Sequence, residues 1–480
     1  MRIPGQWRST GVLNCILWVF VLLAGCTPPG PGGGYAPAQS VESAEKKGRL
    51  SLFLNLQETE GPDLSMQITA VDLLGGNGAW QNFFSGTVTA RTGQIKGGQQ
   101  FLARMALPPD TYTRIRLVLG EVHVAHEGGG QEPLTPRSPE VVLDLRDPLH
   151  IAEGDSRALF FTWDTKASLK EGRFAPVLLI APRLKQLIAD VAYVACPDID
   201  TVFMISTQKN RVIDSIGIPG RPSVLLRNRI FGRDKVYALT NSELVGFSTA
   251  ANEIVEKNNL SMTRKAVHMT FSPDGRWGYI IDQQRGSVLR MDMHSGSIDN
   301  QVRLNYAPNY IVYQKEANLL AVSIGIAQNV VALDPETLQT IGSVSTGVNP
   351  DGMMNWEDSL LYIAETGSNS VVVYDLVSNA MVKRITVGFQ PRRIAHSDSF
   401  IYVANTGSRS ISVLLPGMLG VSRTISFPGG PLEMAYSESH KWLYVGSQQG
   451  GNIAIIDPIT NEITGTIELG ATPAEILVVE

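Results

Sequence analysis

The chain is poor in cysteine, the residue that forms covalent cross-links and many reactive sites. Only three cysteines occur in 480 residues, and Cys15 and Cys26 lie in or beside an amino-terminal apolar stretch. Cys196 is then alone in the rest of the chain, so no intramolecular disulfide is expected there. Because Cys196 directly follows the apolar residues 193–195, we interpret it as a buried strand residue and not as a reactive thiol.

The sequence also lacks the motifs of common catalytic and cofactor sites. It contains no Gly-x-Ser-x-Gly, no His-Glu-x-x-His, no phosphate loop, no dinucleotide fingerprint and no Cys-x-x-Cys-His for covalent haem. The seven histidines are dispersed, and His123 and His126 are spaced so that they point to opposite faces of a strand. We therefore expect no catalytic residue, no bound metal and no cofactor.

Positive charge is not in excess. The chain has 40 Lys and Arg residues against 45 Asp and Glu residues, for a formal net charge of −5. Loss of residues 1–25 would remove Arg2 and Arg8 and no acidic residue, which makes the remainder more acidic. A nucleic acid is therefore not an expected partner.

The amino terminus has the features of a targeting segment. Arg2 and Arg8 precede an apolar stretch at residues 11–24, whose length is typical of a secretory signal and not of a membrane-spanning helix. The sequence Leu23-Ala24-Gly25-Cys26 resembles the bacterial lipobox. This resemblance implies a signal peptide at residues 1–25 and a lipoprotein acylated at Cys26, for example with palmitate, that is held on a membrane. Thr27, and not Asp, follows, which by the enterobacterial sorting pattern implies the outer membrane of a bacterial cell envelope.

Two segments of different composition follow the signal. Residues 26–47 are rich in proline, glycine, alanine and serine, which predicts a flexible tether. Residues 48–184 contain about eight apolar runs without a convincing helix, which predicts a β-sandwich domain. The expected strands cover residues 50–56, 66–73, 86–89, 101–105, 114–123, 140–145, 158–163 and 174–180.

Two motifs in this segment resemble those of a domain of unknown function that is common in bacterial lipoproteins. Residues 107–117 (LPPDTYTRIRL) and residues 161–168 (FTWDTKAS) carry the resemblance. Asp110 stands where that family usually has glycine, although Asp tolerates left-handed conformations. The family is classed with carbohydrate-binding-like sandwiches, so the resemblance implies a binding or spacer role without naming a ligand.

Residues 185–480 contain a sevenfold repeat. One short apolar run recurs every 40 to 44 residues, at Tyr193, Tyr237, Tyr279, Leu320, Tyr362, Tyr402 and Tyr444. The unit that starts near Pro391 has four such runs, at residues 393–395, 400–404, 410–414 and 423–427. A period near 40 that is built of short alternating runs is typical of a four-stranded propeller blade. The prediction is an all-β protein in which a seven-bladed β-propeller follows the β-sandwich.

The two ends of the repeat predict how the ring closes. The first unit has no room for an innermost strand before Tyr193, whereas residues 473–479 read as an innermost strand without a blade of its own. We expect residues 476–479 to pair with residues 193–195, which would leave no exposed sheet edge.

Acidic residues recur at the start of the turn after the third run of a blade. Asp292, Asp334, Asp375 and Asp457 occupy this position. An Asp at a turn start accepts hydrogen bonds from the main chain that follows, so we interpret these residues as turn caps and not as metal ligands.

The repeat resembles that of the YVTN family of seven-bladed propellers. The best copies of its motifs are Tyr402-Val403-Ala404-Asn405, Asp457-Pro458-Ile459-Thr460-Asn461 and Val387-Gly388-Phe389-Gln390-Pro391. The resemblance implies an extracytoplasmic binding or scaffold domain, although a few relatives of the wider class are enzymes.

Propellers commonly bind ligands where loops enter the innermost strands, at the mouth of the central channel. The residues that fall there are Ser223, His268, Asn309, Tyr310, Asp351, Arg392, Arg393, Glu433 and Glu475. The mixed charge suits a small polar ligand or a peptide, and it equally suits a face that binds nothing. Asp351, Glu433 and Glu475 could form an acid–base pair, but we interpret them as solvated charges on the rim.

Two functional hypotheses follow. The first is a monomeric, membrane-anchored lipoprotein that acts as a non-catalytic binding or scaffold module for a protein or glycan partner. The alternative is a propeller lactonase or hydrolase with a divalent metal in the channel. A purely structural spacer in the cell envelope is a third, weaker hypothesis.

Overall fold

The structure is a computed structural model that describes residues 47–57, 61–95, 98–126, 130–184, 190–230, 233–357 and 359–480. The expected signal peptide, Cys26 and most of the expected tether lie outside these residues. Glu45–Glu480 form one compact unit. Among the described residues, no helix is both long enough and apolar enough to cross a bilayer.

The first part of the chain forms two packed sheets, as predicted. One sheet has the order β11-β8-β1-β4, and the other has the order β3-β2-β5-β6, with β7 paired to β5. Their strands are β1 (Gly48–Leu56), β2 (Asp63–Leu74), β3 (Trp80–Arg91), β4 (Gln99–Leu107), β5 (Asp110–Ala125), β6 (Gln131–Leu134), β7 (Glu140–Ile151), β8 (Ser156–Asp164) and β11 (Val177–Ala181). Strands β9 (Leu169–Lys170) and β10 (Arg173–Phe174) form a small separate hairpin.

One hydrophobic core lies between these two sheets. Leu52, Met66, Tyr112, Phe161 and Trp163 are among its fully buried members. The observed strands are mostly longer than expected. The sequence analysis missed β6 and two single-turn helices, α1 (Thr92–Ile95) and α2 (Thr165–Ser168), because segments this short leave no periodic pattern.

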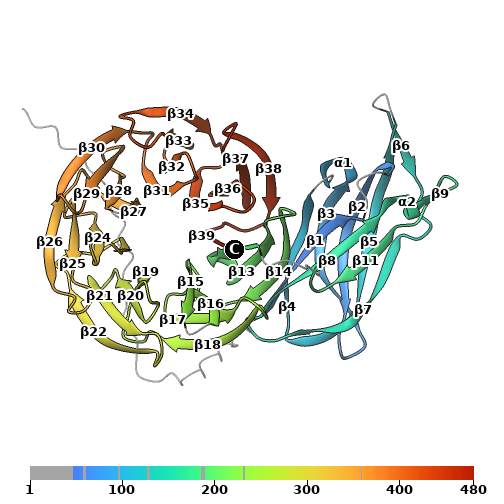
Figure 1. Cartoon of the computed structure of the whole chain (residues 1–480). Helices are drawn as coiled ribbons and strands as arrows, with labels where there is room; N and C mark the ends of the chain where they lie inside the picture. Colours follow the sequence, from blue (N-terminus) through green and yellow to red (C-terminus); the bar gives the residue numbers. More distant parts are fainter. Residues whose placement is uncertain are drawn as a thin grey trace, which may run out of the picture. The chain divides into compact units, whose positions relative to one another are not determined.

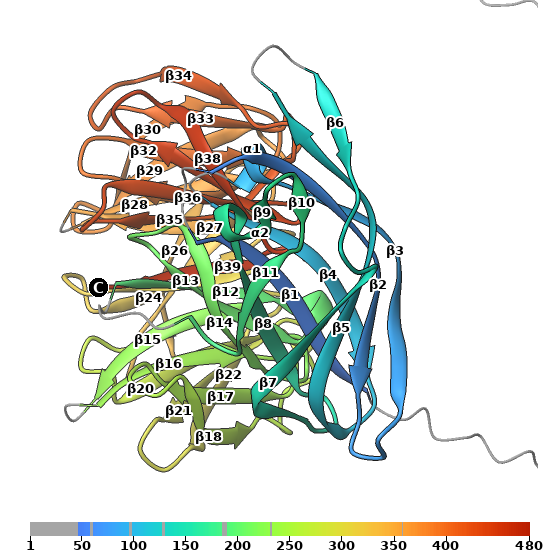
Figure 2. The same ribbon diagram turned by 90° about the vertical axis from the view of Figure 1, so that its right-hand side faces the viewer.

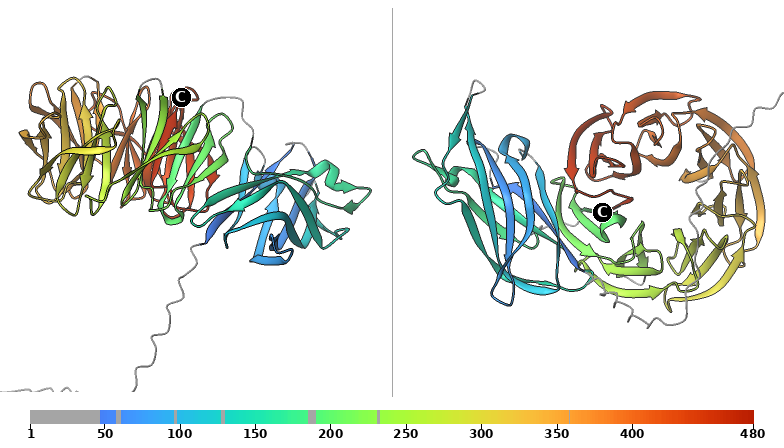
Figure 3. Two further views of the ribbon diagram at one scale, coloured as in Figure 1. Left: turned by 90° about the horizontal axis from the view of Figure 1, so that it is seen from below. Right: turned by 180° about the vertical axis from the view of Figure 1, so that it is seen from behind.

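The second part of the chain is a seven-bladed β-propeller (Figure 1). Each blade is a four-stranded antiparallel sheet, and the innermost strands surround the centre of the ring, as the right-hand view in Figure 3 shows. Blade 1 consists of β39 (Glu475–Val479), β12 (Val191–Cys196), β13 (Thr201–Ser206) and β14 (Arg211–Gly217). A single 3-10 turn, η1 (Pro197–Ile199), joins β12 to β13.

The other six blades each take four consecutive strands, with the innermost strand first. Blades 2, 3 and 4 consist of β15 (Val224–Ile230), β16 (Arg233–Leu239), β17 (Glu243–Ser248), β18 (Glu253–Asn259); β19 (Ala266–Phe271), β20 (Trp277–Asp282), β21 (Ser287–Asp292), β22 (Ser297–Arg303); and β23 (Tyr310–Gln314), β24 (Leu319–Ile324), β25 (Asn329–Leu333), β26 (Thr340–Ser345). Blades 5, 6 and 7 consist of β27 (Pro350–Trp356), β28 (Leu360–Glu365), β29 (Ser370–Asp375), β30 (Ala380–Thr386); β31 (Pro391–His396), β32 (Ile401–Asn405), β33 (Ser410–Leu414), β34 (Val421–Ser426); and β35 (Pro431–Ser437), β36 (Trp442–Ser447), β37 (Asn452–Asp457), β38 (Glu462–Glu468).

The predicted ring closure is confirmed. Strand β39 pairs antiparallel with β12, and Leu477 lies opposite Tyr193 in the ladder. The last strand of the chain thus supplies the innermost strand of the first blade (Figure 1). Because the closing contact is a full ladder, the inner edge of β12 is paired and blade 1 has four strands like the others.

The repeated tyrosine lies in the second strand of its blade, and in three blades it links that blade to the next. The Tyr402 hydroxyl in blade 6 donates to Asn461 Oδ1 of blade 7 at 3.2 Å. The Tyr444 hydroxyl in blade 7 donates to Asn210 Oδ1 of blade 1 at 2.7 Å. Both rings are fully buried, so this single residue type supplies core volume and a bond between neighbouring blades.

The aspartates at the turn starts are caps, as predicted. Asp334 Oδ1 accepts hydrogen bonds from the main-chain nitrogens of Glu336 and Thr337 at 3.0 and 2.7 Å. Asp292, Asp375 and Asp457 make the equivalent bonds in their blades. In Asp334 and Asp292 these bonds lower the carboxyl pKa, because they stabilise the charged form.

The sandwich contacts the propeller through blades 1 and 7. Phe53 and Phe160 of the sandwich share a buried cluster with Phe203 of blade 1 and Ile467 of blade 7. The Gln99 side chain pairs with both main-chain groups of Val212 in the outer strand β14, at 3.0 and 3.1 Å. The Arg104 guanidinium donates to the carbonyls of Leu469 and Gly470 at 2.8 and 2.7 Å. These contacts join the sandwich to both blades at the closure.

Candidate functional site

The innermost strands bring most of the predicted site residues to the start of the central channel. His268 lies in β19, Tyr310 in β23, Asp351 in β27, Arg392 and Arg393 in β31, Glu433 in β35 and Glu475 in β39. The pairing of β19, β27, β31 and β35 with their neighbours shifts register near these residues. Such bulges re-aim side chains and are frequent beside functional sites. Six blades therefore contribute to one site.

Arg393 is at the centre of the group of charges. Its guanidinium pairs with Glu433 at 2.8 Å and with Asp351 at 3.3 Å. Asp351 also pairs with Arg392 at 3.0 Å. The close approach of the main chains requires Gly352, because a Cβ at this position would lie 2.2 Å from the Arg392 carbonyl oxygen.

An aromatic pair covers Arg393 on the side of blades 3 and 4. The Arg393 guanidinium lies 5.0 Å from the centre of the Tyr310 ring, which is a cation–π distance. The His268 ring stacks on Tyr310 with 3.7 Å between the ring centres. Burial, with the charge of Arg393, lowers the pKa of His268 to about 3, so the imidazole is uncharged. Asn309 bonds to Gln283 and to the Pro350 carbonyl, and it ties the entering loops together.

The interpretation of Asp351, Glu433 and Glu475 as solvated rim charges is wrong. Asp351 is 7% exposed and Glu433 is 9% exposed, and both are neutralised by arginine. Two arginines balance Asp351 and Glu433, and Glu475 forms no ion pair with any residue that the structure describes. Burial raises the pKa of Glu475 well above its usual range, and the charge of Glu433 raises it further. The charge balance and the raised pKa both favour the protonated form of Glu475.

The sequence analysis missed this arrangement because the partners are about 40 residues apart and belong to different blades. The result is a buried polar network across the channel and not an open ring of ligands. Among the described residues, no group of three or more His, Cys, Asp or Glu side chains is arranged to hold a metal ion.

A polar cavity of about 320 Å³ adjoins this network at the mouth of the channel. Blades 5, 6 and 7 line it with Asn349, Asp351, Thr366, Gln390, Arg392, Thr406 and Gln448. Only Arg392 and Asp351 among the predicted site residues belong to this lining. The other five residues lie in loops, and two of them could have been found, because Asn349 and Gln390 directly precede the proline that begins an innermost strand.

The lining offers several free hydrogen-bonding groups. Asn349 and Gln390 have φ angles of +55° and +53°, a left-handed conformation that holds their loops in a fixed course. With the residues that the structure describes, the side-chain amides of Asn349, Gln390 and Gln448 make no hydrogen bond. Arg392 uses its Nε atom to bind Asp351, and its side chain is 49% exposed. An arginine with free terminal nitrogens and three free amides can bind a carboxylate or a peptide main chain.

Exposed apolar side chains surround the mouth. Tyr306, Val348 and Phe389 lie in loops that connect consecutive blades, and Phe389 is 66% exposed. Ile326, in the β24–β25 turn on the same face, is 76% exposed. Large apolar groups around a polar centre are typical of protein-binding surfaces.

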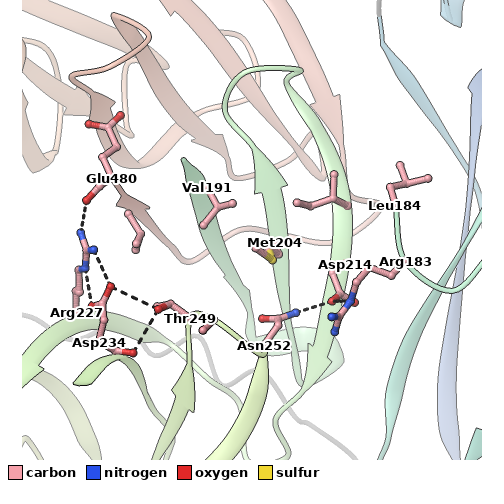
Figure 4. A pocket seen from close by; sticks show the side chains of 13 residues that line it. Arg183, Leu184, Val191, Met204, Asp214, Arg227, Asp234, Thr249, Asn252 and Glu480 are labelled. Atoms are coloured by element: carbon pink, nitrogen blue, oxygen red, sulfur yellow. Dashed lines mark hydrogen bonds and ion pairs between the residues drawn. The ribbon is translucent and has the colours of Figure 1, made fainter. Parts of the chain in front are cut away.

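A second cavity, of about 470 Å³, lies between blades 1 and 2 on the opposite face (Figure 4). Its charged groups are already paired. Arg227 binds Asp234 through two hydrogen bonds of 2.8 and 2.7 Å, and Arg183 pairs with Asp214. Arg227 also donates to the main-chain oxygen of Glu480 at 2.7 Å, so this arginine holds the end of the closing strand to blade 2.

No protein-family model matches the sequence, and no curated protein matches it. Solved structures do match the fold. A protein of unknown function from Desulfotomaculum acetoxidans has a TM-score of 0.53 at 14% identity, over 61% of this chain and 99% of its own. A protein from Bacteroides fragilis, provisionally assigned as a 6-phosphogluconolactonase, has a TM-score of 0.53 at 12% identity, over 62% of this chain and 100% of its own.

The β-propeller domain of Cps50 (Swd1) from Myceliophteria thermophila also matches, with a TM-score of 0.45 at 11% identity, over 52% of this chain and 86% of its own. At these identities the likeness extends to the fold alone. The likeness to the two structures with a TM-score of 0.53 concerns the fold, and no activity follows from it.

Proposed function

We propose that this chain is a non-catalytic binding module that recognises a protein partner with the mouth face of its propeller. The observation that carries the proposal is the polar cavity at Arg392, with free amides, on a face that also presents exposed apolar loop residues. The buried network beneath the cavity is neutralised internally, so it forms a rigid floor. A ligand would therefore bind on this face and would not pass into the channel.

The mixture of groups favours a protein over a glycan. Aromatic, methionine and arginine side chains are enriched in protein interfaces, and Tyr306, Phe389, Met262 and Arg392 are all exposed here. A partner segment with a carboxylate or a free main chain could bind Arg392 while apolar side chains cover Phe389. A glycan partner, which the carbohydrate-binding-like resemblance of the sandwich would suit, is the weaker form of the proposal.

Site-specific photo-crosslinking in intact cells tests the proposal. A photoreactive residue in place of Phe389 should capture one defined partner. The same residue in place of Val377 is the matched control, because Val377 is 72% exposed but lies in a turn on the opposite face. Equal capture at both positions would speak against recognition by the mouth.

The captured partner then allows a quantitative test. Arg392→Ala should weaken its binding to the purified propeller by about tenfold, the loss expected for one charged hydrogen-bond pair. Arg393 still pairs with Asp351 in this variant, so the fold should not change. An unchanged affinity would exclude Arg392 from the interface.

We also propose that a lipid on Cys26 holds the module on the outer membrane. The lipobox resemblance at residues 23–26 supports this part of the proposal. Metabolic labelling with a palmitate analogue should mark the protein, and Cys26→Ser should abolish the label. Label that persists in Cys26→Ser would refute acylation at this residue.

The alternative is a lactonase or hydrolase with a divalent metal in the channel. Elemental analysis of the purified protein for calcium and manganese, followed by a lactone-hydrolysis assay, decides between the two. A stoichiometric metal together with turnover would replace the binding module with an enzyme.

A further inference from the structure

The sandwich has an open side, which is separate from the mouth of the propeller. Strand β7 at the edge of one sheet and β11 at the edge of the other lie side by side, but they form no ladder (Figure 2). A cavity of about 570 Å³ opens between β7, β8 and β11. A second cavity of about 350 Å³ adjoins it and shares Arg146, Ile180 and Ala181 with it. Together these two cavities are called the sandwich groove below.

A bulge in β7 forms one wall of the groove. Asp144 pairs with Arg114 and Leu149 pairs with Tyr112, so residues 145–148 of β7 face the single Thr113 of β5. An insertion of this kind bends the strand away from its partner and is frequent at functional sites. It directs Arg146 and Asp147 into solvent beside the groove.

The floor of the groove is the hydrophobic core itself. Leu145, Leu149 and Leu159 line the larger cavity and belong to the core cluster of the sandwich. Leu178 and Leu179 line the smaller cavity, and Leu179 is 55% exposed. The apolar floor is thus continuous from one cavity to the next.

The rim of the larger cavity is basic. Arg146, Arg157 and Arg183 line it, together with Asp147, and Arg183 is already paired with Asp214. Arg146 makes no ion pair or hydrogen bond with any residue that the structure describes. Arg157 pairs only loosely with the half-buried Asp155, at 3.5 Å. Two arginines whose guanidinium groups are unpaired or weakly paired, Arg146 and Arg157, therefore lie above an apolar floor, which suits an anionic amphiphile.

We propose that the sandwich groove binds a single acyl chain with an anionic head. The head pairs with Arg146 and Arg157, and the chain lies on Leu145, Leu149 and Leu159. The volume is in the range of natural small-ligand sites. Free fatty acids and anionic membrane lipids share this chemistry, and this site is independent of the recognition proposed for the mouth face.

Titration of laurate into a purified fragment of residues 45–480 tests the proposal. This fragment is the compact unit that contains both the sandwich and the propeller. Laurate below its micellar concentration should bind at one saturable site, monitored by calorimetry. Dodecanol, which has no charge, should bind at least tenfold more weakly, and acetate, which has no chain, should not bind.

Four variants locate the site. Arg146→Gln should weaken the binding of laurate about tenfold and leave the binding of dodecanol unchanged. Ala181→Phe fills the part that both cavities share, so it should abolish the binding of both compounds. Leu179→Asp should also weaken the binding of laurate. Because Leu179 is exposed, this variant keeps the proposal testable if Ala181→Phe does not fold. Arg173→Gln, at an exposed arginine outside the groove, is the matched control and should bind as the parent does.

The outcomes are distinct. Co-sedimentation with phosphatidylglycerol vesicles but not with phosphatidylcholine vesicles identifies the ligand as a membrane lipid, and laurate binding without vesicle binding identifies a free fatty acid. No saturable binding, or laurate binding that is the same in Arg146→Gln, Ala181→Phe and Leu179→Asp, overturns the proposal.

Discussion

Replacing Arg393 with methionine removes the cation that neutralises the carboxylates in the propeller channel. Methionine keeps most of the apolar stem, so the change isolates the guanidinium. Glu433 would lose its partner at 2.8 Å, and Asp351 would keep only Arg392. The side chains of Asp351 and Glu433 are 10% and 11% exposed, so water cannot replace the lost cation.

The expected loss in the free energy of unfolding is about 3–5 kcal/mol at pH 8, the range for leaving one partner of a buried ion pair behind. The loss should be smaller at pH 5, because protonation of Glu433 removes the unpaired charge and is more favourable at the lower pH. Burial already raises the pKa of Glu433, and Arg393 opposes this rise. Without Arg393 the pKa rises further. Stability from a carboxyl with a raised pKa is present at low pH and is lost as the pH rises through the folded-state value.

Urea denaturation of residues 45–480 at pH 5 and pH 8, followed by tryptophan fluorescence, measures both quantities. The control is Arg423→Met. Arg423 pairs with Glu462 at 3.9 Å on the surface, where both side chains are at least half exposed, so its loss should stay below about 1 kcal/mol. The reasoning is refuted if Arg393→Met costs less than about 1 kcal/mol at pH 8, or if it costs the same at both pH values.

Three further predictions concern other buried groups. The free energy of unfolding should decrease less with pH above about pH 4.5 in Glu475→Gln than in the parent, because the variant lacks a carboxyl whose folded-state pKa is raised. Urea denaturation at several pH values that gives the same decrease for both proteins would contradict this. Cys196 should resist iodoacetamide at pH 8 until the protein unfolds, because burial raises its pKa to about 12; peptide mass spectra that show rapid labelling in native buffer would disprove its burial. Tyr444→Phe should cost about 1–2 kcal/mol by leaving Asn210 unpaired between blades 7 and 1, and a melting temperature equal to that of the parent would exclude this bond as a stabilising contact.

The blades and their closure could be predicted from the sequence because their signals are local. A strand needs only alternation over a few residues, and a cap needs only an Asp at a turn start, as at Asp334. The missing strand before Tyr193 and the surplus strand at residues 475–479 could be counted directly. The paired register of β39 and β12 agrees with that count.

The sequence was enough to locate the candidate site at the channel mouth, but it did not predict the burial and pairing of the charges there. A charge is usually solvated, so a sequence gives no reason to bury Glu433, and its partner Arg393 is supplied by another blade. The bulge at residues 145–148 could not be predicted from the sequence for a related reason, because register depends on a partner strand and not on the strand itself. The contacts of Phe53 and Arg104 with the propeller likewise join residues from distant parts of the sequence.

The contact of the sandwich with blades 1 and 7 has a consequence for biosynthesis. Arg104 binds carbonyls at residues 469 and 470, so this joint cannot form until nearly the whole chain has been made. Until then the aromatic surface around Phe53 and Phe160 has no final partner. Nascent chains with exposed apolar surfaces are prone to aggregate. A chaperone that shields this surface until blade 7 is complete would therefore raise the yield of folded protein more than one that assists any single blade.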